Sequence, residues 1–212
     1  MKGFSGGRIA SERFSAHGWR VQIIVEVGVD PLVYRDGECQ RLVRAPSVCP
    51  NCGRAQSLEA HGYYWRWVAG VCGLQVLIAV RRFECRHCPV TVSCLPQFAQ
   101  PYRLVCNETI EAFFAEKKGR PDVERWRELL GNYRRRYEGF LPKLRAACGA
   151  LFGRSPPQEQ ASGFWRRIMN ACGGLAAATG RLVHALGITL FGRYRVHQRR
   201  DLSRFHTESK TR

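Results

Sequence analysis

The sequence predicts an α+β protein in which a small three-stranded antiparallel sheet is followed by an all-helical C-terminal region. Residues 61–84 contain two runs rich in aromatic and β-branched residues, HGYYWRWVA and LQVLIAVRRF, separated by a bend at Gly70–Gly73. This pattern is typical of a β-hairpin. From residue 107 onward the apolar residues recur instead at the spacing of amphipathic helices. The change of period at this point predicts a sheet half and a helical half.

Two C-x-x-C pairs flank the predicted hairpin, with 32 residues between them. One such turn supplies two thiolates from a tight loop, and two turns complete a tetrahedral shell with zinc–sulfur distances of about 2.3 Å. The sequence therefore predicts one structural zinc ion in a three-stranded antiparallel zinc ribbon over residues 47–105. The predicted ligands are Cys49, Cys52, Cys85 and Cys88.

Disulfides, buried thiols and a redox motif are the alternatives for these cysteines. The chain shows no signal peptide and is expected to be cytoplasmic, where disulfides are rare. A thioredoxin-like motif has one C-x-x-C that opens a helix, which differs from two matched turns around a hairpin. The other six cysteines share no ligand spacing and are expected to be small hydrophobic residues; they are Cys39, Cys72, Cys94, Cys106, Cys148 and Cys172.

Residues 1–46 are predicted to form an N-terminal extension that contains candidate strands. Its first 18 residues carry glycine and serine without periodicity and are expected to lack regular structure. Trp19–Val29 fits a strand, which either adds an edge to the ribbon or stands apart from it. The third ribbon strand is predicted in VTVSCL, after the second cysteine pair, and a proline-marked connector follows.

Residues 106–192 are predicted to form a helical domain. Its first helix begins at Asn107, which fits a cap, and ends near two lysines and Gly119. The next helix is predicted to start at Pro121, and its apolar stripe runs from Val123 to Leu144 at 3-4 spacing, but Gly139 and Pro142 interrupt it. This interruption predicts one helix to about residue 138 and a second from about 141 to 151.

Two shorter helices are expected in FWRRIMNAC and GLAAATGRLVHALG. The stretch LVHALGITLFGRYR also resembles a helix-turn-helix unit, although Gly192 would fall inside its second helix. Residues 193–212 are predicted to be a basic tail.

The charge of the chain points to an anionic partner. It carries 34 Lys and Arg against 17 Asp and Glu, a formal net charge of +17. Nucleic acid, DNA in preference, is the partner that such a balance favours. The candidate contacts are arginines of the helix from Pro121 and of the basic tail: Arg125, Arg127, Arg134, Arg135, Arg136, Arg193, Arg195, Arg199 and Arg200. Interleaved glutamates leave a simple solvated helix face as the alternative.

The residue types of a catalytic site are sparse. Two-metal nuclease or strand-transfer chemistry needs several carboxylates, and the four aspartates lie outside any convincing core strand. A four-cysteine zinc site leaves no position open for water. We therefore expect a protein that is not an enzyme. No uncharged run reaches 18 residues, so no membrane-spanning helix is expected.

Four motifs occur in order: CPNCG, HGYYWR, RFECRHCPVT and LPQFAQPY. They lie at Cys49–Gly53, His61–Arg66, Arg82–Thr91 and Leu95–Tyr102, and over about residues 47–105 they resemble the zinc-ribbon domain of bacterial transposon-associated proteins. Similar ribbons occur at the N-terminus of some insertion-sequence transposases. Pro89 departs from the family pattern, in which glycine is usual. The resemblance implies a structural zinc, DNA association and a mobile genetic element, but no catalytic domain.

The sequence thus favours a non-enzymatic, zinc-stabilised nucleic-acid-binding protein of a mobile element. A transposase or another mobile-element protein is a further expected partner. No association with a membrane is expected. The alternatives are a protein-interaction scaffold with a structural zinc and a truncated transposase remnant.

Overall fold

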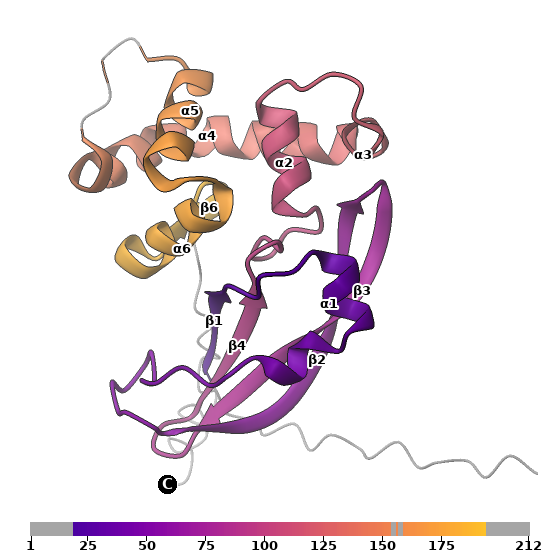
Figure 1. Ribbon diagram of the computed structural model, residues 1–212. Helices are drawn as coiled ribbons and strands as arrows, with labels where there is room; N and C mark the ends of the chain where they lie inside the picture. The colour runs from indigo at the N-terminus through magenta and orange to yellow at the C-terminus, as the bar shows by residue number, and fades with distance from the viewer. Residues whose placement is uncertain (1–18, 154–155, 157–158, 194–212) are drawn as a thin grey trace, which may run out of the picture.

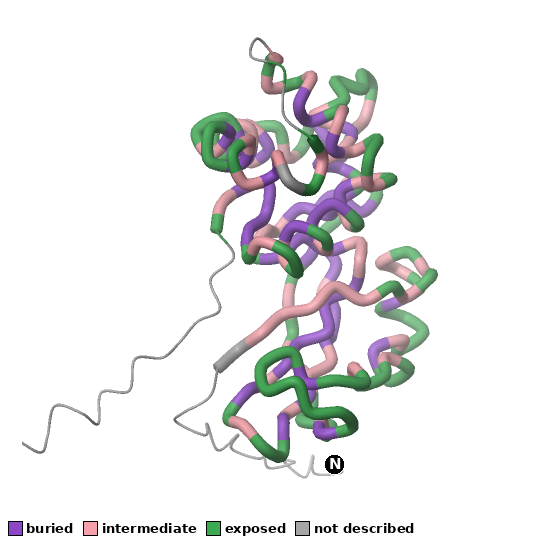
Figure 2. Tube along the Cα trace, turned by 90° about the vertical axis from the view of Figure 1, so that its left-hand side faces the viewer, coloured by how far each residue is buried: buried purple, intermediate pink, exposed green. Residues whose placement is uncertain are grey.

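A computed structural model describes residues 19–153, 156 and 159–193 of the chain. Figure 1 shows a sheet in one half of the molecule and helices gathered beyond one end of that sheet. In Figure 2 buried stretches run through both halves, with exposed stretches around them. The predictions for residues 1–18 and for residues 194–212 of the basic tail lie outside the described residues.

The sheet has four strands in the order β1-β4-β3-β2: β1 (Trp19–Val25), β2 (Leu58–Val71), β3 (Leu74–Cys85) and β4 (Val90–Pro96). The predicted hairpin is present as β2 and β3. Cys72 and Gly73 form its two-residue loop, both with positive φ, as in the turns that suit tight hairpins. Strand β4 pairs with β3 in antiparallel fashion, so this part of the prediction is confirmed.

The prediction of three antiparallel strands was wrong, because β1 adds a fourth that runs parallel to β4. Val21 and Ile23 of β1 lie beside Val90 and Val92 of β4 in one apolar cluster. Pairing with β1 therefore buries apolar surface and also satisfies the outer edge of β4, which would otherwise expose unpaired backbone groups. Of the two alternatives for Trp19–Val29, the structure shows the edge strand.

The segment after β1 covers one face of the sheet. It contains α1 (Pro31–Asp36) and the 3-10 helix η1 (Cys39–Leu42), and the Asp30 side chain caps α1 by accepting hydrogen bonds from two backbone N–H groups. Tyr34 is fully buried, and its hydroxyl donates to the Ala79 carbonyl at 3.0 Å. Burial raises the pKa of Tyr34, which keeps this donor protonated. The apolar core under α1 includes Val68, Ile78 and Val80.

The helical half contains α2 (Asn107–Phe114), α3 (Pro121–Arg125), α4 (Arg127–Phe152), α5 (Ala161–Cys172) and α6 (Leu175–Leu186). Two very short strands, β5 (Ile188–Thr189) and β6 (Gly192–Arg193), follow α6. The core of this half contains an aromatic cluster: the Phe114 and Trp165 rings stack at 4.0 Å, and Phe191 lies against both. Because β5 and β6 form a hairpin, the predicted second helix of a helix-turn-helix unit was wrong.

The predicted break at Gly139 and Pro142 was also wrong, since α4 runs without interruption through both residues. Pro142 removes one helical N–H and costs about 3 kcal/mol in a helix interior. Tyr137, Leu141 and Leu144 are buried on either side of it, and such side chains stabilise a fold by about 1.5–3 kcal/mol each. Continuous burial of the stripe therefore outweighs the cost of the proline.

The start of α2 also differs in detail from the prediction. Asn107 is the first helical residue and is buried, and its side-chain amide donates to the Gln97 carbonyl at 2.6 Å instead of capping the helix. The helix ends at Phe114, before the two lysines. Asn107 thus ties α2 to the connector that follows β4.

The two halves meet at Gly70, in a bulge near the tip of the hairpin. The Thr109 hydroxyl of α2 lies 2.8 Å from the Gly70 carbonyl and 2.6 Å from Oδ2 of Asp122, and it donates to one of these acceptors at a time. Asp122 also accepts two hydrogen bonds from the Arg120 guanidinium. Beside this contact, Ala69 exchanges backbone hydrogen bonds with Leu104 and Cys106. This junction fixes the sheet against α2 and α3.

Candidate metal centre

The four predicted ligand cysteines converge at the end of the sheet. The ligand atoms of Cys49, Cys52, Cys85 and Cys88 all lie within 4.8 Å of one another. Cys49 Sγ lies 3.7 Å from Cys88 Sγ, and Cys52 Sγ lies 3.7 Å from Cys85 Sγ. A disulfide needs about 2.05 Å, so these are not disulfides. Tetrahedral thiolates at about 2.3 Å from zinc would lie about 3.8 Å apart, which fits both distances.

The first cysteine loop is shaped by backbone hydrogen bonds. Cys49 N donates to the Arg54 carbonyl at 2.9 Å, and Gly53 N donates to the Cys49 carbonyl at 3.0 Å. An isolated bridge between Val48 and Ala55 closes the loop at its base. Gly53 adopts a φ of 71°, which glycine reaches without steric cost. The loop thereby presents both sulfurs to one side.

The second cysteine loop joins β3 to β4. The His87 backbone N–H donates to Cys85 Sγ at 3.4 Å, and Val90 N donates to the Cys88 carbonyl at 2.7 Å. Pro89 has no N–H, but Val90 provides the donor that closes this turn. The second loop is therefore stabilised in spite of its proline.

The two cysteines of the second loop have different acidities. Burial acts to raise the pKa of Cys85, but its hydrogen bonds with the Ser57 side chain and with the backbone N–H groups of His87 and Cys88 lower it to about 6. Burial and the neighbouring sulfurs raise the pKa of Cys88 to about 12. Four thiolates this close together require a compensating cation, and a bound metal ion deprotonates its thiol ligands outright.

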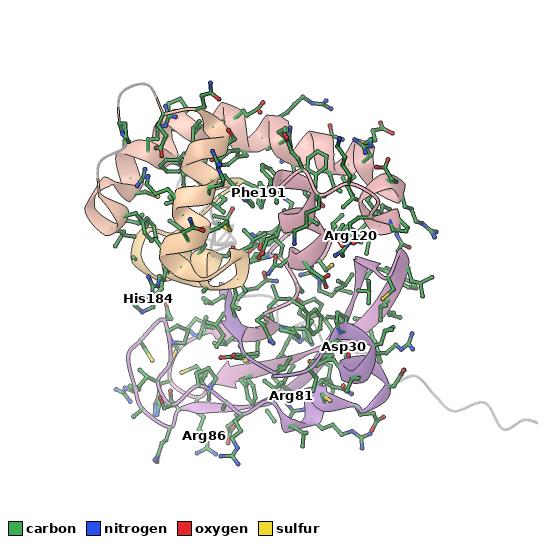
Figure 3. The ribbon with its side chains drawn as sticks, turned by 45° about the horizontal axis from the view of Figure 1, so that its top comes forward. Asp30, Arg81, Arg86, Arg120, His184 and Phe191 are labelled. Carbon is green, nitrogen blue, oxygen red and sulfur yellow. The ribbon has the colours of Figure 1, made fainter. Side chains whose placement is uncertain are left out.

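Apolar residues surround the sulfurs on the sheet side. Cys49 and Cys85 are buried with Val90 and Val92, while Cys52 is exposed. Arg54 and Arg86, which lie beside the ligands, are both exposed: Arg54 contacts the His87 ring at 3.0 Å, and Arg86 forms an ion pair with Glu59. Figure 3 shows Arg86 far from Phe191 of the helical half. The cluster is a compact site that could hold one metal ion away from the helices.

The predicted nucleic-acid-binding arginines of α3 and α4 differ in their surroundings. Arg127 forms an ion pair with Glu124, and Arg135 donates to Asn132. Arg134 packs 4.7 Å from the Phe113 ring and lies 3.6 Å from a Glu116 oxygen. The remaining two of this group, Arg125 and Arg136, are exposed without an acidic partner among the described residues.

Arg193 lies at the end of β6 and is exposed. The other tail candidates, Arg195, Arg199 and Arg200, lie outside the described residues. Sequence reasoning missed two further residues, Trp65 and Trp67, which were treated only as strand formers and are 65% and 52% exposed. Their alternate positions on one strand show that they share a face.

The comparisons with known proteins concern the segment that begins at the first ligand. Residues 49–128 match the family model of a domain of unknown function, DUF6431. The matched segment contains the four cysteines, strands β2 to β4, helices α2 and α3 and the Gly70 junction. No zinc-ribbon or transposon family is shown by this match. No curated protein and no solved structure matches the chain.

Proposed function

We propose that the protein is a non-enzymatic, zinc-stabilised nucleic-acid-binding protein, with DNA as its preferred partner. The observation that carries this proposal is that several arginines of the described residues, Arg103, Arg125 and Arg136, have no acidic partner there. Arg103 is half-buried, and burial together with the nearby Arg136 guanidinium lowers its pKa. Its guanidinium donates hydrogen bonds to the backbone carbonyls of Tyr102 and Phe191. Phosphate groups are the ligands that such uncompensated guanidinium groups attract.

Zinc is the metal that the donor set favours. Four soft thiolates within 4.8 Å of one another, two pairs of them at 3.7 Å, suit a tetrahedral ion. A shell closed by four protein ligands stabilises structure and leaves no position for a reacting water. The only described carboxylate that is both buried and near basic groups, Asp122, is already held by Arg120 and Thr109. These contacts support a structural role for the metal and for Asp122.

The metal assignment is tested with two exposed cysteines. Cys52→Ser removes a proposed ligand, whereas Cys72→Ser, in the hairpin loop, removes none. Elemental analysis of protein purified without chelator should find one zinc per chain in the parent and in Cys72→Ser, and less in Cys52→Ser. Structural zinc contributes on the order of 10 kcal/mol of binding free energy, so Cys52→Ser should also melt at lower temperature. Parent protein without zinc would contradict the assignment.

The nucleic-acid assignment is tested with two exposed arginines of α4. Arg136 has no acidic partner among the described residues, whereas Arg127 is paired with Glu124. Binding of a mixed-sequence duplex should weaken steeply with salt. Arg136→Gln should reduce the slope of log K against log salt by about 0.9, the effect of one phosphate contact, and Arg127→Gln should change it less. An affinity independent of salt would instead favour the protein-interaction scaffold.

The association with a mobile element rests on the four ordered motifs at Cys49–Gly53, His61–Arg66, Arg82–Thr91 and Leu95–Tyr102. It makes a transposase the natural protein partner, and a truncated transposase remnant the alternative. If the protein is not an enzyme, duplex DNA incubated with it and Mg²⁺ or Mn²⁺ should remain intact. Cleavage that is lost in Asp122→Asn would contradict this proposal.

A further inference from the structure

The outer face of the β2–β3 hairpin carries a row of three aromatic side chains, of which two are exposed and Tyr63 is partly buried. Tyr63, Trp65 and Trp67 occupy alternate positions of β2 and therefore point to one side of the sheet. Trp65 is 65% exposed and Trp67 is 52% exposed, whereas Trp165 of the helical core is 3% exposed. Large aromatic side chains gain by burial, so two neighbouring exposed tryptophans indicate a binding surface.

Among the described residues, the exposure of Trp65 and Trp67 follows from how the hairpin is placed. Helix α1 packs on the opposite face, where Tyr34 lies in one apolar cluster with Val68 and Ile78. Strand β4 pairs with β3 only over Arg81–Glu84, so the distal part of the hairpin extends beyond it. The cross-strand partners of Trp65 and Trp67 are Ala79 and Leu77. Such small or aliphatic neighbours leave the indole rings accessible.

Positive charge adjoins the aromatic row. Arg81 pairs across the strands with Tyr63, and its guanidinium carbon lies 4.6 Å from the Tyr63 ring centroid and 5.4 Å from that of Phe83. Figure 3 shows Arg81 on the sheet half. No acidic side chain pairs with Arg81 among the described residues. The row thus joins flat apolar rings to an uncompensated cation.

We propose that Tyr63, Trp65, Trp67 and Arg81 form a stacking platform for single-stranded DNA. This inference rests on the proposed nucleic-acid function and deepens it. Alternate residues of a strand lie about 7 Å apart, a spacing that successive nucleotides of an extended single strand can match. Each base stacked on an aromatic side chain contributes about 1–3 kcal/mol, and an adjacent arginine contacts the backbone phosphates.

Charge and base accessibility favour single-stranded DNA over a second copy of the chain or a duplex as the ligand of this face. Two copies of a chain with a net charge of +17 repel each other, and their pairing through this face would bring two Arg81 guanidinium groups together. A duplex keeps its bases stacked inside, out of reach of exposed indole rings. A single strand offers free base faces to the aromatic rings. Its phosphates also offer Arg81 the anionic partner that this side chain lacks among the described residues.

The experiment compares a labelled single-stranded DNA of mixed sequence with its duplex, measured by fluorescence anisotropy. The parent, W65A/W67A and W65F/W67F are used as full-length zinc-loaded chains. W65A/W67A should bind the single strand at least tenfold more weakly, while W65F/W67F should retain most of the affinity because its rings still stack. Duplex affinity should be the same in all three. Intrinsic tryptophan fluorescence of the parent should be quenched by the single strand.

Five results would overturn the platform or its ligand. Unchanged single-strand affinity in W65A/W67A, or equal losses for single strand and duplex, would remove the stacking role while the proposed function stands. Tighter binding of single-stranded RNA would overturn the choice of DNA. A parent dimer that W65A/W67A converts to a monomer, with single-strand affinity unchanged, would assign the face to a second copy. A parent that binds neither form of nucleic acid would contradict the proposed function as well.

Discussion

A carboxylate oxygen of Glu111 lies 2.6 Å from the backbone nitrogen of Leu175, which donates a hydrogen bond to it, so a side chain of α2 caps the N-terminus of α6. The residue before α6 is Gly174, which has no side chain to cap it. A helix N-terminus has unpaired N–H groups and a partial positive charge. The Glu111 carboxylate accepts a hydrogen bond from one of these N–H groups, and its negative charge compensates the partial positive charge. This contact joins α2 to α6 through two residues that are 64 positions apart in the chain.

Glu111→Ala should lower the free energy of unfolding by about 1 kcal/mol, the usual effect of losing a cap. Glu111→Gln, which keeps an acceptor and loses the charge, should lower it less. Chemical denaturation measures both. Glu138→Ala, at an exposed position of α4, is the control and should change little. A loss in Glu138→Ala equal to that in Glu111→Ala would show that the cap is not responsible.

Gly70→Ala should weaken the junction between the two halves. A Cβ at Gly70 would lie 2.6 Å from the Thr109 hydroxyl oxygen, and the backbone φ is +87°. Left-handed strain and overpacking together predict a loss of roughly 2–5 kcal/mol in unfolding free energy. Gly73→Ala provides the control, because Gly73 has a φ of +77° and no neighbour within 4 Å. Equal losses in the two variants would mean that the Thr109 contact contributes nothing.

Stability at low pH should depend on Asp122. The hydrogen bonds from Arg120, opposed by burial and assisted by Thr109, lower the pKa of Asp122 from 3.8 to about 2. Because the folded-state pKa is the lower one, this stabilisation is present above about pH 4 and is lost as the pH falls through about 2. Asp122→Asn should therefore be less stable than the parent by about 2 kcal/mol at pH 6, with the difference narrowing toward pH 2.

Denaturation of both proteins across this pH range measures the difference directly. Asp36→Asn is the matched control, since the pKa of Asp36 is also lowered by an arginine, Arg35, but its side chain is exposed. An exposed pair contributes little to stability. A difference between parent and Asp122→Asn that stays constant with pH would argue against the ion pair.

Pro142→Ala should stabilise the protein. Pro142 is exposed in the interior of α4, where it leaves one backbone hydrogen bond unmade. Alanine restores this donor without filling a packed site, so the unfolding free energy should rise by about 1 kcal/mol or more. If two helices instead met at this proline, alanine would remove the break between them and the variant would be destabilised.

The features that could be predicted from the sequence are those that depend on residues close together in the chain. The cysteine spacing indicated the four-sulfur cluster, and the turn at Cys72–Gly73 follows from local backbone preferences. The partner of β1 could not be predicted, because strand pairing over such a distance leaves no periodic signal. The continuity of α4 depended on burial around Pro142, which local propensity opposes.

The same limit applies to the exposed tryptophans. Alternation along β2 placed Trp65 and Trp67 on one face, but it gave no sign of which face α1 would cover. The role of Asp122 was equally hidden, because Thr109 and Gly70 come from different elements. Only tertiary contacts distinguish a structural carboxylate from a free one.

The parallel pairing of β1 with β4 also sets an order of events during protein synthesis. Trp19–Val25 leaves the ribosome before its partner Val90–Pro96 exists, with both cysteine loops translated in between. The cysteine loops and the antiparallel hairpin can form from local contacts, whereas β1 must wait for β4. The first of the described strands to be translated is thus among the last to pair, and until then its apolar residues remain unprotected by β4.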